Sequence, residues 1–152
     1  EAGAGPGEGF TVNVPLDRGS GDREFARVLR WLAAPLAREY LPKAILVSCG
    51  FDLHQADPLA HLNGTGAGYA LLTRLLCRIA DEVCQGRIAF VLEGGYSTRG
   101  VREGALNVMQ ELCGVPAAPE ADAERLGAQP PGRFTNLRKV LDLHAKYWRL
   151  GP

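Results

Sequence analysis

AILVSCGFD, residues 44–52, decides the fold class of this chain. Its apolar run, Ala44 to Ser48, is typical of a parallel strand that is covered on both faces. A second apolar run, Ile88 to Leu92, precedes Glu93-Gly94-Gly95-Tyr96. Segments with helical periodicity follow both runs, and this alternation of strand and helix predicts an α/β domain with a parallel sheet.

Capping and turn residues delimit the other predicted elements. In chain order we expect a short strand over residues 10–15, a helix that begins with Asp22 as N-cap and is bent or broken at Pro35, a strand over 44–48, a helix capped by Thr65 and stopped by Gln85-Gly86, a strand over 88–92, a helix over 101–112 and a terminal amphipathic helix over about 137–148. Residues 116–133 lack periodicity, so we expect a surface excursion or a mobile linker there.

The composition predicts one globular domain. The chain has 152 residues, 46% of them hydrophobic, which is enough for one core and too few for two comfortable ones. Lys plus Arg and Asp plus Glu both number 17, so no long-range field attracts nucleic acid or an anionic membrane surface. We therefore expect no direct nucleic-acid binding.

The sequence predicts a cytoplasmic protein, or a nuclear one in a eukaryote. The four cysteines form no CxxC pair and are interpreted as reduced thiols. No apolar run approaches the ~18 residues of a transmembrane helix, so we expect no membrane partner. The chain begins without Met in a Gly-rich stretch, and we expect it to be a segment of a longer protein.

Asp52 and Tyr96 are the residues most suited to chemistry. Each follows a predicted strand, and parallel sheets bind ligands beyond the carboxyl ends of their strands. A carboxylate there can ligate a cation, and a phenol can donate a hydrogen bond to a developing oxyanion. On pattern alone, the alternative is that Asp52 braces a loop and Tyr96 covers the sheet edge.

Three stretches resemble the histone deacetylase superfamily, including the bacterial acetoin-utilisation-type deacetylases. They are GFTVNVPLDRGSGD (residues 9–22), SCGFDLHQADPL (48–59) and VLEGGYSTRG (91–100), in the family's order and spacing. The resemblance implies a three-layer arginase/deacetylase-type α/β fold with a parallel sheet, of which this chain is the C-terminal portion. It also implies three parts: residues 1–115 in the catalytic domain, 116–133 as excursion or linker, and 134–152 as a docking C-terminal helix.

The same resemblance implies roles for five residues. Asp52 matches one aspartate of a Zn²⁺ site built from two Asp and one His, and Tyr96 matches the tyrosine that stabilises the tetrahedral oxyanion. Gly94 and Gly95 match glycines that let the backbone approach the substrate, and Leu59 matches a wall of the substrate tunnel. The implied reaction is hydrolysis of an acetylated amine.

Other residues define what this chain lacks. His54, His61 and His144 form neither the family's His-His dipeptide nor its Asp-x-His pair. One carboxylate cannot hold a catalytic zinc, which needs three protein ligands. We therefore expect the chain to be inactive without the missing N-terminal half of the catalytic domain. We expect Asp57 to hold its loop through backbone hydrogen bonds, and Glu93 to brace a turn.

Three functional hypotheses remain. The leading one is a zinc-dependent deacetylase acting on acetylated lysine in protein or peptide. The second is a deacetylase of acetylpolyamines or other small acylated amines. Polyamine-preferring relatives resemble one another in a glutamate after the Asp-Pro of this loop, whereas this chain has Leu59, which favours lysine. The third is a degenerate, non-catalytic deacetylase-like interaction module with an exposed apolar patch.

Overall fold

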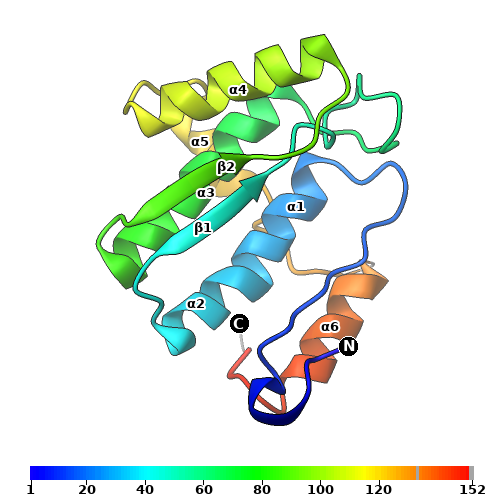
Figure 1. Ribbon diagram of the computed structural model, residues 1–152, viewed down its shortest axis with the longest axis vertical. Coiled ribbons are helices and arrows are strands. Elements are labelled where there is room, and N and C mark those ends of the chain that lie inside the picture. Colours follow the sequence, from blue (N-terminus) through cyan, green and yellow to red (C-terminus); the bar gives the residue numbers. More distant parts are fainter. Residues whose placement is uncertain (133, 151–152) are drawn as a thin grey trace.

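The computed structural model describes residues 1–132 and 134–150, which surround a two-stranded parallel sheet. Strand β1 (Ile45–Cys49) pairs with β2 (Ile88–Leu92), from Ile45 opposite Ile88 to Cys49 opposite Leu92. Helix α3 (Gly66–Cys84) connects the strands and lies behind them, with α4 (Thr98–Leu112) above and α1 and α2 below (Figure 1). The other helical elements are η1 (Gly5–Gly7), α1 (Asp22–Val28), the π-helical turn η2 (Leu29–Ala33), α2 (Ala34–Tyr40), α5 (Glu120–Arg125) and α6 (Thr135–His144).

Local signals account for the crossover helix α3. The Thr65 hydroxyl accepts a hydrogen bond from the Gly68 N–H at 2.9 Å, which confirms the predicted cap. Gln85 takes the left-handed conformation and Gly86 follows with positive φ, so the helix ends where the sequence predicts. The apolar stripe of α3 enters the core beneath the sheet, where Leu72 and Leu75 are buried.

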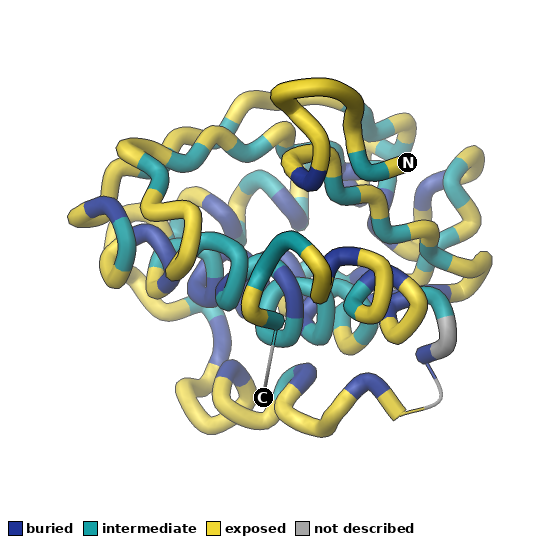
Figure 2. Tube along the Cα trace, turned by 90° about the horizontal axis from the view of Figure 1, so that it is seen from below, coloured by how far each residue is buried: buried dark blue, intermediate teal, exposed yellow. Residues whose placement is uncertain are grey.

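The strand predicted over residues 10–15 is absent from the described structure. Val12 and Val14 instead pack against a cluster that contains buried Leu32 and, on α6, buried Leu137. The alternating pattern therefore reports one-sided burial without a paired strand. In the view from below, the first residues form a largely exposed loop, and buried positions occur mainly in helices (Figure 2).

The first long helix differs from its prediction at the N-cap but is interrupted near Pro35, as predicted. Gly21, not Asp22, occupies the N-cap, and the Glu24 carboxylate accepts the Gly21 N–H at 3.0 Å. Asp22 instead accepts bonds from Thr65, from its N–H at 2.9 Å and its hydroxyl at 2.8 Å. Regular α-helical bonding is interrupted over η2, just before Pro35, because proline cannot donate to the preceding turn.

The C-terminal region folds back onto the helices. The predicted excursion over residues 116–133, of which residue 133 lies outside the described structure, includes α5, whose buried Ala123 accepts a hydrogen bond from Arg30 through its carbonyl. Helix α6 ends at His144, earlier than predicted, and Trp148 beyond it donates to the Gly9 carbonyl at 2.8 Å. The division of the chain into three parts stays a prediction.

One face of the sheet is exposed, so the prediction that both strands are covered on both faces is wrong for this chain. Leu46 and Val91 are 78% and 51% exposed, whereas Phe90 and Cys49 pack against the core. Helix α3 covers only the inward face, and no other described element covers the opposite one. None of the helices in the described ranges combines the length and hydropathy of a bilayer-spanning helix.

Candidate active site

The two segments that carry Asp52 and Tyr96 leave the sheet together. Cys49 and Leu92 are paired at the last position of the strands, so both chains emerge at one edge. The Phe51 N–H donates to the Gly94 carbonyl at 2.7 Å, which ties the segments directly after the strands. The carboxylate and the phenol predicted from sequence therefore belong to one hydrogen-bonded edge.

Asp52 occupies a notch formed by two glycines. A Cβ atom at Gly94 would lie 2.6 Å from Asp52 Oδ2, and one at Gly50 would lie 2.7 Å from Asp52 Oδ1. Both distances are far below van der Waals contact, so the carboxylate fits only because these positions lack side chains. Asp52 is partly exposed, and no residue within 1–132 or 134–150 donates a hydrogen bond to its oxygens.

Asp57 organises the loop that follows, as predicted. Its Oδ1 accepts the N–H groups of Leu59 at 2.9 Å and Ala60 at 3.1 Å. Its Oδ2 accepts the Tyr96 N–H at 2.8 Å, a contact that the sequence did not predict. Burial raises the pKa of Asp57 and these three backbone hydrogen bonds lower it, and the net pKa lies below the ordinary value.

The two side chains predicted to contact the substrate, those of Tyr96 and Leu59, are exposed although Asp57 binds the backbone N–H groups of both residues. Tyr96 is 64% exposed although Asp57 holds its backbone, and Leu59 on the same loop is 60% exposed. An exposed phenol on a backbone held in place can donate a hydrogen bond from its hydroxyl to a bound ligand. Asp57 therefore links the predicted tunnel wall to the predicted oxyanion donor.

Gly95 has a packing requirement of its own. Its φ is 137°, and a Cβ there would lie 2.9 Å from both Phe51 Cβ and Val101 Cγ2. A side chain would therefore be strained and would also push α4 away from the strand end. The substrate-binding roles of Gly94 and Gly95 stay predictions, since these contacts give each glycine a structural reason.

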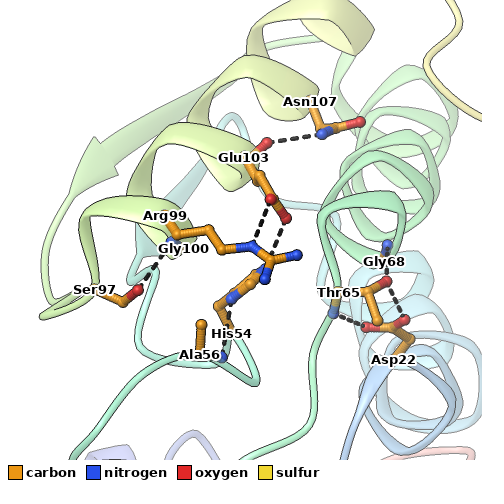
Figure 3. Close-up of polar contacts among 10 residues, drawn as sticks. All are labelled: Asp22, His54, Ala56, Thr65, Gly68, Ser97, Arg99, Gly100, Glu103 and Asn107. Atoms are coloured by element: carbon orange, nitrogen blue, oxygen red, sulfur yellow. Dashed lines mark hydrogen bonds and ion pairs between the residues drawn. The ribbon is translucent and has the colours of Figure 1, made fainter.

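Buried His54 lies at the centre of a partly exposed polar network that also includes Glu103 and Arg99 (Figure 3). Its imidazole is 0% exposed; Nδ1 accepts the Ala56 N–H at 3.1 Å and Nε2 lies 3.1 Å from Glu103 Oε2. Glu103 also accepts from Arg99 Nε at 2.8 Å. Bonding to Arg99 lowers the pKa of Glu103, and the contact with His54 lowers it further against the opposing effect of burial. No sequence signal joins residues 49 positions apart, so this pair was missed.

Tyr69 and Cys49 support the ends of the strands from the side of the core. The Tyr69 hydroxyl of α3 donates to the Gly50 carbonyl at 3.1 Å, and burial strongly raises the pKa of this phenol. Burial likewise raises the pKa of the Cys49 thiol, which packs as a small apolar group. Glu93 is exposed and accepts only a long bond, 3.4 Å, from the Ser48 hydroxyl. Tyr69 and not Glu93 therefore provides the main brace.

The chain alone does not fit a catalytic zinc ion. Within residues 1–132 and 134–150, no three His, Cys, Asp or Glu side chains are grouped to hold a metal. Asp52 is the only predicted ligand, and catalytic zinc sites ordinarily have three from the protein. Any such site would need ligands from outside this chain.

Known proteins resemble the chain over most of its length. Residues 1–112 match the histone deacetylase domain. A probable deacetylase of Archaeoglobus fulgidus is 33% identical over 98% of this chain and 44% of its own length. Histone deacetylase 14, chloroplastic, of Arabidopsis thaliana is 42% identical over 75% of this chain and 27% of its own.

Two solved structures extend the likeness to the fold. The HDA15 HD domain aligns with a TM-score of 0.79 and 29% identity, covering 97% of this chain and 38% of that one. The histone deacetylase Clr3 aligns with a TM-score of 0.83 and 31% identity, covering 98% of this chain and 24% of that one. The chain thus spans less than half the length of each of these four relatives.

Proposed function

The chain belongs to the histone deacetylase family, and from that membership we propose that it is part of a zinc-dependent catalytic domain that removes acetyl groups from lysine. One observation carries the proposal. Among residues 1–132 and 134–150, none donates a hydrogen bond to the Asp52 carboxylate in its glycine notch, on the edge that also presents Tyr96. A carboxylate available to a cation and an exposed phenol on one sheet edge match the needs of metal-assisted acyl hydrolysis.

Each residue of the edge then has a role. Asp52 would hold the zinc ion as one of its ligands, and the ion would supply Lewis-acid chemistry toward the acetyl carbonyl. The Tyr96 hydroxyl donates a hydrogen bond to the oxyanion as the carbonyl becomes tetrahedral. Asp57 keeps the Tyr96 backbone in place, and the exposed Leu59 contacts the substrate's methylene stem.

The remaining ligands and the proton-transferring histidines come, in this proposal, from parts of the catalytic domain outside this chain. Two observations support that arrangement: the relatives are more than twice as long, and the apolar face of β1 and β2 is exposed. The chain by itself is then inactive. Purified alone, it should leave an acetyl-lysine reporter intact whether or not zinc is added.

The choice of lysine over small amines rests on Leu59. An apolar side chain at the tunnel wall contacts methylene groups and offers no counter-charge to a second ammonium group. An acetylpolyamine substrate is the alternative within the same chemistry. A comparison of kcat/KM for an acetyl-lysine peptide and for N-acetylspermidine decides between them.

A non-catalytic interaction module is the second candidate function. The exposed apolar side chains of the sheet, including Leu46, Val91 and Leu92, favour it because they could bind a partner in place of missing strands. Under that proposal, the domain containing this chain would bind no zinc and hydrolyse no acetyl-lysine peptide.

The decisive experiment uses the catalytic domain that contains this chain. Asp52→Ala should abolish stoichiometric zinc binding and activity, and Tyr96→Phe should keep zinc while lowering kcat by about 10²-fold. Tyr40→Phe is a matched control, since Tyr40 is 57% exposed and lies on α2. Full activity in both site variants would refute the proposal.

A further inference from the structure

We propose that His54 is a positioning residue, which locks the loop carrying Asp52 and Asp57 onto helix α4 and so keeps the predicted metal ligand aligned with Tyr96. This inference rests on the proposed function for its catalytic consequence. The hydrogen bonds that carry it involve His54 itself and are independent of any bound metal.

Both nitrogens of the imidazole are engaged in a defined tautomer. The Ala56 N–H donates to Nδ1, so the ring proton lies on Nε2 and is donated to Glu103 Oε2. The ring is 0% exposed. With no free nitrogen and no exposed edge, His54 is excluded as a metal ligand or general base, and its role is to hold two segments together.

One of those segments is the start of α4, which follows Tyr96 by two residues. Ser97 caps this helix by accepting the Gly100 N–H at 3.2 Å. A Cβ at Gly100 would lie 2.9 Å from His54 Cβ, so the helix packs directly against the histidine (Figure 3). Glu103, one turn later, reaches back to the ring. His54 thus fixes the helix that sets the position of Tyr96.

The other segment is the loop after β1. The His54 N–H donates to the Phe51 carbonyl at 3.3 Å, and its carbonyl accepts the Asp57 N–H at 2.8 Å. These bonds connect the His54 backbone to Phe51, which precedes Asp52, and to Asp57, whose carboxylate holds the Tyr96 backbone. Displacements of about 1 Å at a reacting group can cost on the order of 10²-fold in rate, so such a clamp matters for catalysis.

Two conservative variants separate the two bonds. In His54→Gln, the side-chain amide N–H can reach Glu103 as Nε2 does, while the bond to Ala56 is lost. In His54→Asn, the short side chain can accept the Ala56 N–H but cannot reach Glu103. His54→Ala removes both. His144→Gln is the matched control, because His144 is a 1% exposed histidine on α6, at the far end of the molecule (Figure 1).

The test measures kinetics and amide exchange in the catalytic domain. We expect His54→Ala to lower kcat by about 10-fold or more with little change in KM, and His54→Gln, which keeps the link to α4, to recover more of that loss than His54→Asn. Hydrogen–deuterium exchange should accelerate in both peptides 54–60 and 94–98 for His54→Ala, in peptide 54–60 for His54→Gln, which loses the Ala56 bond, and in peptide 94–98 for His54→Asn, which loses the Glu103 bond. His144→Gln should leave kcat and these peptides unchanged.

The outcomes separate this inference from the proposed function. If the wild-type domain is inactive, the proposed function fails, and the exchange rates alone test the clamp. If the wild type is active and His54→Ala keeps its kcat and the protection of peptide 94–98, the positioning role is overturned. If His54→Ala does not fold, equal kcat in the folded Asn and Gln variants and the wild type overturns it instead.

Discussion

Replacing Gly94 by alanine tests the notch that holds Asp52. The new Cβ would lie 2.6 Å from Asp52 Oδ2 and 3.1 Å from its Cγ, and these are the closest contacts it would make. Ordinary contact starts near 3.4 Å, so the carboxylate oxygen must move by about 0.8 Å. Metal-ligand distances tolerate only about ±0.2 Å, so the displaced carboxylate cannot ligate as before.

The stability cost should be small because the clash falls on the end of a side chain. We expect Gly94→Ala to lower the free energy of unfolding by about 1 kcal/mol, at the low end for overpacking. Zinc affinity of the catalytic domain should fall by about 10- to 100-fold, the scale for disturbing a ligand's support. Urea unfolding and zinc titration measure the two effects separately.

A double-mutant cycle isolates the cause. In an Asp52→Ala background the carboxylate is gone, so Gly94→Ala should cost nothing further in stability. Gly7→Ala is the control, since a Cβ at Gly7 would meet nothing within 4 Å. If the stability costs of Gly94→Ala and Asp52→Ala are additive, or if Gly94→Ala leaves zinc affinity unchanged, the notch does not position the Asp52 carboxylate.

Three further predictions follow from the contacts around the site and in the core. Asp57→Asn turns its amide toward the Tyr96 N–H, so donor faces donor, and kcat should fall with faster exchange at that amide. Because the pKa of Asp57 is lowered on folding, its stabilisation is present at neutral pH and lost as pH falls below about 3.9, so this variant should flatten the acid limb of a pH–stability curve. Leu59→Glu should shift the kcat/KM ratio toward acetylpolyamines, and a tenfold polyamine preference in the wild type would contradict the lysine proposal. Glu111→Gln leaves the buried Arg74 without its bidentate partner, at 2.6 and 2.8 Å, and should lower the unfolding free energy by about 3 kcal/mol, measured by urea unfolding.

Local patterns predicted the elements whose burial and caps lie within one segment. The hydroxyl of Thr65 and the Gln85-Gly86 stop bound α3 because each cap joins residues no more than six positions apart in the sequence. The strand predicted at residues 10–15 failed because pairing needs a partner strand, which no local pattern specifies. Its alternating apolar residues instead pack against the terminal helix α6.

The sequence by itself placed Asp52 and Tyr96 just beyond two strands joined by one helical crossover, which predicts that both lie at the carboxyl edge of a parallel sheet. Only the tertiary structure decided what holds them there. The bonds from His54 to Glu103 and from Asp57 to Tyr96 join residues 49 and 39 positions apart. A hydrogen bond forms over about 3 Å, and whether distant residues come that close depends on how α4 packs against the loop after β1.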